Sequence, residues 1–253
     1  MTLPRTPSFR LDGRRALVLG ASRGIGLACA AALAEAGAHV VCAARSRDAL
    51  AGLVAAITAA GGAAEAMSLD VNDVAALEAI ARIEGLRIFV NSAGIARHAP
   101  ALDTTPENFD AVMGANVRGA YFATVAAARA MAAHGQGGSI INISSQMGHV
   151  GGVDRTVYAA SKHAIEGMTK AMAIEWGKRA IRVNTIAPTF IRTELTAKTF
   201  ADPARREWIM SKIKLDRVGE VEDVMGATVF LASDASAMVT GASLLVDGGW
   251  TAD

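Results

Sequence analysis

Short runs of aliphatic and β-branched residues, each bounded by Gly, Asn or Asp, recur along the chain and predict seven β-strands. The runs occupy residues 16–19, 39–43, 67–69, 88–90, 139–143, 181–186 and 243–246. Between them, apolar residues at helical spacing predict helices over 24–36, 48–60, 74–83, 108–133, 157–178 and 221–232. Strands that alternate with helices are typical of a doubly wound parallel sheet. The pattern therefore predicts an α/β protein with a three-layer αβα Rossmann fold and a seven-stranded sheet.

The same pattern predicts where ligands bind and how the chain is divided. The carboxyl ends of parallel strands meet at one edge of the sheet, so residues that follow strands are the candidates for function. No linker, repeat or low-complexity tract interrupts the alternation, which indicates one domain over residues 1–253. The longest stretch with few helical signals, residues 187–217, is expected to form a mobile lid over the substrate.

Composition narrows the function classes. Hydrophobic residues make up 52% of the chain and charged residues 19%, which excludes a disordered protein. The formal net charge of +1 provides no field that would attract nucleic acid. Cys29 and Cys42, like His98, His149 and His163, lack metal-ligand spacing, so no metal site is expected. The three histidines are therefore treated as non-catalytic. Neither a signal-peptide pattern nor a long apolar stretch is found, so we expect the cytoplasm and no membrane partner.

A glycine-rich turn follows the first predicted strand and opens the first predicted helix. Its sequence is Gly-Ala-Ser-Arg-Gly-Ile-Gly, and the residues of interest are Gly20, Ser22, Arg23, Gly24, Ile25 and Gly26. Glycines there permit a tight turn and let the helix N-terminus approach a pyrophosphate. The spacing G-x-x-x-G-x-G differs from the ordinary G-x-G-x-x-G fingerprint, and such a turn can also serve only to pack a helix on a strand.

Further motifs follow the later strands in order. Asn-Ser-Ala-Gly at 91–94 follows the fourth predicted strand, Ser-Ser at 144–145 follows the fifth, and Tyr-Ala-Ala-Ser-Lys at 158–162 lies in a predicted helix. With the glycine-rich turn, these motifs make the chain resemble the short-chain dehydrogenase/reductase (SDR) family along essentially its whole length. That resemblance implies an enzyme that transfers a hydride between a nicotinamide cofactor and an alcohol or ketone.

The resemblance also implies which residues hold the cofactor. The glycine-rich turn would bind the pyrophosphate, and Asp70 and Val71 would lie beside the adenine. Asn91, Ala93 and Gly94 would line the adenosine and ribose. The implied cofactor set also includes residues that follow the sixth predicted strand, which are Pro188, Thr189, Ile191 and Thr193. Tyr158 and Lys162 complete it, and Lys162 would hold the ribose.

Three positions depart from the family pattern. Leu19 stands where Thr is usual, Ser92 where the second Asn of Asn-Asn-Ala-Gly is usual, and Thr189 where the Gly of Pro-Gly is usual. The first two remove side-chain hydrogen bonds around the cofactor loops and concern stability more than chemistry. Thr189 restricts the backbone beside the nicotinamide and adds a hydroxyl there.

The end of the second predicted strand bears on the choice of cofactor. An acid there bonds the ribose 2′-hydroxyl of NAD, whereas an Arg accommodates the 2′-phosphate of NADP. This chain has Arg45 and Ser46 at that point and no carboxylate, and Arg23 supplies a second guanidinium from the turn. The pattern predicts a preference for NADP(H). NAD(H) is left open, because both arginines could instead be solvated surface residues.

Tyr158 and Lys162 are the candidate acid–base pair, because residues four apart share one face of a helix. The pKa of free tyrosine is about 10, and an adjacent ammonium stabilises the phenolate, so the pair can exchange a proton with the substrate oxygen. The resemblance implies that Ser145, at the family's interval from Tyr158, orients the substrate carbonyl, while Ser144 points the other way. It also implies that Asn116 holds a water on a proton path to Lys162; the alternative is an amide that only bonds nearby backbone.

The substrate pocket is expected beside the catalytic residues and under the lid. Candidate substrate residues are Gln146, His149, Leu195 and Trp208, with Thr189, Ile191 and Phe200 as further lining. The lid aromatics could equally be ordinary core. Because the same framework serves sugars, polyols, steroids and oxoacyl esters, the fold does not identify the alcohol or ketone.

Other functions on this fold remain open. One is a catalytically idle NAD(P)-binding sensor or scaffold, although the intact Ser145, Tyr158 and Lys162 argue against it; another is an NAD(H)-preferring polyol or sugar dehydrogenase. An epimerase or dehydratase of the family's extended branch is disfavoured by the single-domain length and by the C-terminal motifs at 240–241 and 247–250. The resemblance further implies a homotetramer or a dimer, because relatives pair their long helices and C-terminal segments.

Overall fold

Seven parallel strands form one sheet, as the hydrophobic pattern predicts. The computed structural model describes residues 1–252. Its strands are β1 (Arg15–Leu19), β2 (His39–Ala44), β3 (Ala63–Ser68), β4 (Leu86–Asn91), β5 (Gly138–Ile143), β6 (Ile181–Pro188) and β7 (Ser243–Val246). Their order in the sheet is β3-β2-β1-β4-β5-β6-β7, and every adjacent pair is parallel. The order changes direction between β1 and β4, which is the switch point of a doubly wound sheet. The predicted αβα Rossmann fold is confirmed.

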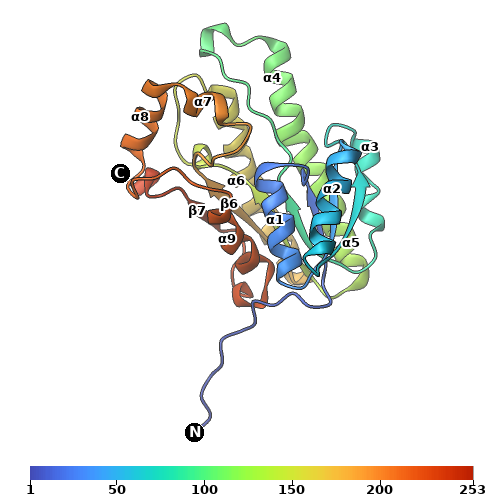
Figure 1. Cartoon of the computed structure of the whole chain (residues 1–253). Helices are drawn as coiled ribbons and strands as arrows, with labels where there is room; N and C mark the ends of the chain where they lie inside the picture. Colours follow the sequence, from blue (N-terminus) through green and yellow to red (C-terminus); the bar gives the residue numbers. More distant parts are fainter. Residues whose placement is uncertain (253) are drawn as a thin grey trace.

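Helices cover both faces of this sheet (Figure 1). They are α1 (Gly24–Glu35), α2 (Arg47–Ala59), α3 (Val74–Leu77), α4 (Pro106–Met113), α5 (Ala120–His134), α6 (Thr156–Trp176), α7 (Ala197–Ala201), α8 (Pro203–Lys212) and α9 (Glu222–Ala232). Along β1, Ala16 and Val18 belong to a core cluster with residues of α1, α2 and α9, whereas Leu17 and Leu19 belong to a second cluster with residues of α3, α5 and α6. Because alternate residues face opposite layers and both layers are apolar, such a strand has a continuous apolar sequence.

Some element boundaries differ from the prediction. β3 begins at Ala63 and ends at Ser68, whereas the pattern placed a strand over 67–69. It lies at the sheet edge, pairs only with β2 and contains no β-branched residue, so its sequence carries little strand signal. The helix predicted over 108–133 is α4 and α5 joined by a π-helical segment, Gly114–Gly119. The helix predicted over 74–83 is α3 followed by a 3₁₀ turn, Ile80–Arg82.

The segment predicted to be poor in helix, 187–217, contains α7 and α8. Asp202 caps α8 by accepting hydrogen bonds from the backbone N–H groups of Ala204 and Arg205, and Pro203 opens the helix. These two residues form a strong helix-start signal, so the expectation of a helix-poor segment was wrong. α8 is anchored through Ile209, which is buried in a small core cluster with Phe190 and Trp250. In Figure 1, α4, α7 and α8 lie at the end of the molecule opposite to the N-terminal segment.

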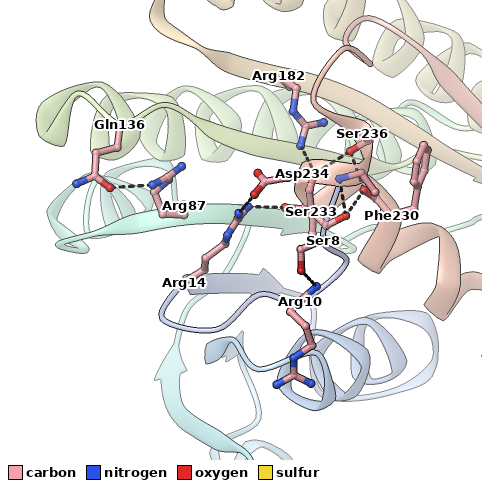
Figure 2. A network of polar contacts seen from close by, with 12 residues as sticks. Ser8, Arg10, Arg14, Arg87, Gln136, Arg182, Phe230, Ser233, Asp234 and Ser236 are labelled. Atoms are coloured by element: carbon pink, nitrogen blue, oxygen red, sulfur yellow. Dashed lines mark hydrogen bonds and ion pairs between the residues drawn. The ribbon is translucent and has the colours of Figure 1, made fainter. Parts of the chain in front are cut away.

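A network of arginines binds the C-terminal end of α9 to the amino ends of the strands (Figure 2). Arg14, just before β1, donates to Asp234 at 2.6 Å and to the carbonyl oxygen of Ala232 at 3.4 Å. Arg182 in β6 donates to the carbonyl oxygens of Leu231 at 2.8 Å and Ser233 at 3.2 Å. Cations that bond the last carbonyls of a helix also interact favourably with its dipole. The side chains of Arg14 and Arg182 thus attach the C-terminal end of α9 to the edge of the sheet where the strands begin.

The remaining compositional expectations concern thiols, metals and membranes. Cys29 and Cys42 are free and buried, and burial raises the pKa of each thiol to about 11. Within residues 1–252, no cluster of three or more His, Cys, Asp and Glu side chains could hold a metal ion. In the same part of the chain, no helix combines the length and apolarity that crossing a membrane requires.

Candidate active site

The glycine-rich turn joins β1 to α1 at the carboxyl edge of the sheet. Gly20 has a φ of +87°, and a Cβ there would lie 2.7 Å from the backbone nitrogen of Ala93. A Cβ on Gly26 would lie 2.1 Å from the carbonyl oxygen of Gly20. Only glycine fits at these two positions, because any side chain would collide with backbone. The turn is therefore packed against the start of its own helix and against the segment that follows β4.

The first turn of α1 offers free hydrogen-bond donors. Its N-cap residue, Arg23, makes no side-chain capping bond, and no acidic residue lies in the first turn. Ser22, Gly24 and Ile25, which surround it, are half-buried. Unsatisfied N–H groups and the helix dipole favour an anion at this point. The turn thus fits the pyrophosphate of a dinucleotide, as the sequence predicts.

The ends of β2 and β3 lie beside this turn, because the two strands follow β1 in the sheet order. Arg45 is exposed directly after β2, and Ser46 caps α2 by accepting from the backbone N–H of Ala49 at 3.4 Å. Asp70 follows β3, and its Oδ1 accepts from the backbone N–H of Asn72 at 2.9 Å. Its neighbour Val71 is half-buried. Ala44, which ends β2, and the two residues after it, Arg45 and Ser46, carry no carboxylate, so no acid stands at the strand end itself, where it would oppose a 2′-phosphate.

Arg23 faces the lid. Its guanidinium lies 3.9 Å from the carboxylate of Glu194, and both side chains are largely exposed, at 70% and 82%. The glycine-rich turn and the segment after β6 therefore meet across the site. Sequence analysis did not single out Glu194.

The segment after β4 contacts the glycine-rich turn through Ala93 and the π-helical segment through Gly94. Asn91 is buried, and its Oδ1 accepts from the backbone N–H of Ala93 at 3.3 Å. Ser92 donates its backbone N–H to the carbonyl oxygen of Leu19 at 2.8 Å, and the Leu19 side chain is buried in the core. A Cβ on Gly94 would lie 3.1 Å from Oδ1 of Asn116. Leu19 thus packs in the core where the family has a polar Thr.

Asn116 lies in the π-helical segment and is buried. Its Oδ1 accepts from the backbone N–H of Ile95 at 2.8 Å, and its Nδ2 donates to the carbonyl oxygen of Ile95 at 2.9 Å and to Oγ of Ser161 at 3.1 Å. Ser161 in turn donates to the carbonyl oxygen of Tyr158 at 2.7 Å. The amide therefore connects the segment after β4 to α6. π-Helical segments of this kind occur frequently at functional sites.

Tyr158 and Lys162 lie on one face of α6, as their spacing predicts. The Lys162 ammonium is 5.6 Å from the centre of the Tyr158 ring and donates to the carbonyl oxygen of Ile143 at 2.9 Å. Lys162 is only 7% exposed, so its charge is held in a region of low dielectric, where it acts strongly on its neighbours. Tyr158 is half-buried and accessible.

Ser144 and Ser145 follow β5, and both are buried. Oγ of Ser145 donates to Oε1 of Gln146 at 2.8 Å and accepts from the backbone N–H of Met147 at 3.1 Å. Oγ of Ser144 is buried without a hydrogen-bond partner among the described residues, and it lies 3.0 Å from the position of a Cβ on Gly148. The two neighbouring hydroxyls thus have different surroundings.

The predicted substrate residues are only partly brought together. His149 directs Nε2 at Oγ of Ser243, 2.8 Å away, and lies 3.6 Å from the carboxylate of Glu166. Leu195 is 66% exposed. Trp208 packs edge-on against Trp250 at a centroid distance of 5.3 Å. The assignment of these residues to the substrate stays a prediction.

The residues after β6 include one unexplained polar group. Oγ1 of Thr189 is buried and has no hydrogen-bond partner within residues 1–252. It borders a cavity of about 430 Å³ that extends toward residues 213–219 and 245–249. Pro188 and Ile191 are buried, and Thr193 is half-buried. A buried hydroxyl without a partner is costly, so Thr189 is a ready donor or acceptor for a ligand at this edge.

Two residues beside Tyr158 were missed by sequence analysis. The ring of His98 lies edge-on to the Tyr158 ring at a centroid distance of 6.0 Å. Arg155 donates to Nε2 of His98 at 2.5 Å and lies over the Phe190 ring at 5.2 Å. The available signal for Arg155 was a cation one helical turn before Tyr158. His98 was dismissed because it lacks metal-ligand spacing, which says nothing about proximity in space.

Known proteins resemble this chain over nearly its whole length. A family model described as enoyl-(acyl carrier protein) reductase, adh_short_C2, matches residues 20–251. Gluconate 5-dehydrogenase of Gluconobacter oxydans is 39% identical over 248 residues, which cover 96% of each chain. D-threitol dehydrogenase of Mycolicibacterium smegmatis is also 39% identical, over 96% of this chain and 95% of the relative.

A solved structure agrees with these relatives. The crystal structure of a gluconate 5-dehydrogenase from Burkholderia cenocepacia, in complex with NADP and tartrate, superposes with a TM-score of 0.93 at 40% identity and covers 97% of this chain and 98% of that one. The fold, the order of the motifs and these matches together show that the chain belongs to the short-chain dehydrogenase/reductase family.

Proposed function

We propose that this protein is an NADP(H)-dependent oxidoreductase that interconverts a secondary hydroxyl and a ketone on a polyol or sugar-derived substrate. The observation that carries the proposal is the buried Lys162 ammonium beside the accessible Tyr158 ring on one face of α6. Relatives named for gluconate, threitol and xylulose support the substrate class. Structural relatives with bound NADP support the cofactor.

The cofactor would be held along the carboxyl edge of the sheet. The glycine-rich turn and the open first turn of α1 would bind its pyrophosphate, and Arg23, Arg45 and Ser46 would bind its 2′-phosphate. Residues after β3 and β4 would line the adenosine, and those after β6 would approach the nicotinamide, where the free Thr189 hydroxyl suits a polar partner. When bound, the cofactor supplies or accepts the hydride. The chain's own residues manage the proton and the substrate oxygen.

Tyr158 would donate its phenolic proton to the substrate oxygen during reduction and take it back during oxidation. The Lys162 charge stabilises the phenolate that remains. Ser145 would turn its hydroxyl proton from Gln146 to the substrate oxygen, which replaces one hydrogen bond by another. Asn116 would hold the segment after β4 against α6, which keeps these groups in register.

The segment 187–217 would cover the substrate. Gln146, His149, Leu195 and Trp208 are the side chains that we propose reach it. The Glu194 end of the segment already lies 3.9 Å from Arg23. The two helices α7 and α8 make this cover a structured element rather than a loop.

We place the protein in the cytoplasm as a homotetramer, with a dimer as the alternative. Large apolar side chains are exposed on the long helices and on β7: Tyr121, Phe122, Ile174 and Leu245. Self-association would cover them. Light scattering coupled to gel filtration measures the assembly directly, and a monomer would refute this part of the proposal.

The proposed activity is tested with a panel of polyols, sugar acids and their ketones. Formation or loss of reduced nicotinamide is followed by absorbance with NADP(H) and with NAD(H). Turnover with higher kcat/KM for NADP(H) supports the proposal. Binding of NADPH without turnover of any substrate would instead support an idle NADP-binding sensor.

A further inference from the structure

A positive region lies directly beside Tyr158, outside the residues assigned to the cofactor. Arg155 is the N-cap residue of α6, makes no side-chain capping bond, and no acidic residue lies in the first turn of this 21-residue helix. The N-terminal N–H groups of α6 therefore add their partial positive charge to that of the guanidinium.

Arg155 is half-buried and forms no ion pair among the described residues, although the charge of Asp154 acts on it from a greater distance. Within the described part of the chain, no carboxylate lies at ion-pair distance from its guanidinium, which bonds His98 and lies over the Phe190 ring at 5.2 Å. Burial lowers the pKa of the Arg155 guanidinium from its usual value. A desolvated cation without an acidic partner is unfavourable unless a ligand supplies the negative charge.

His98 does not supply the missing negative charge, and it does not attract an anion itself, because its ring is neutral. Burial, followed by the charges of Arg155 and Arg205, lowers the pKa of His98 to about 4. At neutral pH its ring is therefore uncharged and accepts a hydrogen bond from Arg155. This contact holds the guanidinium near the Tyr158 ring, which His98 itself meets edge-on at 6.0 Å.

A second cation reaches the same place from the lid. Arg205, on α8, lies 4.0 Å from Asp154 and 3.8 Å from Asp202, so both of its acidic contacts are long. Asp154 immediately precedes Arg155 and adopts a left-handed backbone conformation with a φ of 59°. The positive groups thus come from the start of α6 and from the segment that we propose covers the substrate.

From this arrangement we infer that Arg155 determines specificity by binding a carboxylate of the substrate, so that polyhydroxy acids are preferred over neutral polyols. The inference rests on the proposed function, because it places this anion site beside the proposed proton donor. Arg155 and Tyr158 are one helical turn apart, so an acid bound at Arg155 would present a carbon of the same chain to Tyr158. A guanidinium suits this task because its planar donors match the two oxygens of a carboxylate.

The test compares D-gluconate with D-glucitol, a neutral six-carbon polyol, in the wild-type enzyme, Arg155→Gln and Arg155→Lys. Arg155→Gln should raise KM for gluconate by about tenfold to a hundredfold, the loss expected for a charge-assisted bond, while changing KM for glucitol less than about twofold. Arg155→Lys should recover part of the gluconate affinity. Arg206→Gln removes an equal charge from an exposed position of α8 and should leave both substrates unchanged.

A second readout does not require turnover of an acid. Tartrate, a dicarboxylate, should inhibit oxidation of the neutral polyol competitively in the wild-type enzyme and about tenfold more weakly in Arg155→Gln. Equal losses with gluconate and glucitol would overturn the inference and make Arg155 a brace for the catalytic helix. A wild-type enzyme that oxidises glucitol but neither oxidises gluconate nor is inhibited by tartrate would also overturn it and leave the proposed function standing. No turnover of any alcohol or ketone would refute the proposed function itself.

Discussion

Lys162 lies one helical turn after Tyr158 on α6, with its ammonium 5.6 Å from the centre of the Tyr158 ring. The hydrogen bond to the carbonyl oxygen of Ile143, at 2.9 Å, fixes the ammonium between α6 and the end of β5. A lysine that is 7% exposed loses most of its hydration, so its place must be stabilised by the groups around it. At this position the ammonium can also attract the negative charge of a phenolate on the neighbouring Tyr158.

Replacing Tyr158 with Phe should reduce turnover by about a hundredfold to ten-thousandfold, because it removes the proton donor. NADPH binding, measured by fluorescence titration, should stay within about twofold, since the glycine-rich turn is untouched. Lys162→Ala should reduce both turnover and NADPH affinity. Retention of most activity in Tyr158→Phe would contradict the mechanism.

The two neighbouring serines should behave differently. Ser145→Ala should lower kcat by about tenfold to a hundredfold, because a hydroxyl that bonds the substrate oxygen is lost. Ser144→Ala removes a buried hydroxyl that has no partner among the described residues, so activity and thermal stability should stay the same or increase slightly. Steady-state kinetics and thermal unfolding of both variants show which of the two hydroxyls is needed for activity. The reverse order of activities would reassign the catalytic serine.

Much of the fold was predictable from sequence because strands buried on both faces carry a strong apolar signal. β7 has the predicted bounds, 243–246, and β1 was recognised except for its first residue, the polar Arg15. β3 was placed poorly because an edge strand made of Ala, Glu, Met and Ser has no such signal. The π-helical segment was missed for another reason: its hydrogen-bond pattern depends on the contacts of Asn116 with distant backbone, which periodicity does not report.

The candidate site also contains residues that sequence spacing predicts and residues that only the fold brings together. Tyr158 and Lys162 were predictable because a spacing of four residues on a helix determines their proximity. Arg155 had a signal of the same kind, a cation one helical turn before Tyr158, which the motif analysis did not use. His98 had none, because it reaches Tyr158 only through the fold, from a segment 60 residues earlier in sequence (158 − 98). Glu194 was missed because an exposed acid in a lid has no pattern of its own.

Glu194 should weaken NADPH binding. Its carboxylate lies 3.9 Å from Arg23, where it competes for the guanidinium and repels a 2′-phosphate. Glu194→Gln should therefore lower the Kd for NADPH by up to about fivefold, the size expected for an exposed pair, and leave the Kd for NADH nearly unchanged. The gain should shrink at high salt. An equal change for both cofactors would mean that Glu194 acts on lid closure instead.

The pair of Arg217 and Asp223, at the end of the lid, should make the free energy of unfolding depend on pH. Arg217 donates to both of its oxygens, at 2.6 and 2.7 Å, and this hydrogen-bonded pair lowers the pKa of Asp223 to about 2. Because the folded pKa lies below the unfolded value of about 3.9, the stabilisation is complete above pH ~4 and is lost as the pH falls toward 2. Asp223→Asn should lower the melting temperature at pH 7, by the equivalent of about 1 kcal/mol, and the difference should shrink below pH ~4. A difference that is constant with pH would contradict the assignment.

Replacing Ala44 with Asp and Arg45 with Gln should move the cofactor preference from NADP(H) toward NAD(H). Ala44 ends β2 and Arg45 is exposed just beyond it, so a carboxylate at 44 can bond the ribose 2′-hydroxyl and repel a 2′-phosphate. Loss of Arg45 removes a charge-assisted bond worth about 1.5–3 kcal/mol, or about tenfold to a hundredfold in affinity, while Arg23 retains some NADP(H) binding. Arg47→Gln, which removes an exposed charge in the first turn of α2, serves as the control and should leave the preference unchanged.

The deciding measurement is the ratio of kcat/KM for NADPH and NADH before and after the double change. Because both cofactors carry the same nicotinamide, the ratio should change through KM while kcat stays similar. A wild-type enzyme that already favours NADH would show that Arg23 and Arg45 are only surface charges.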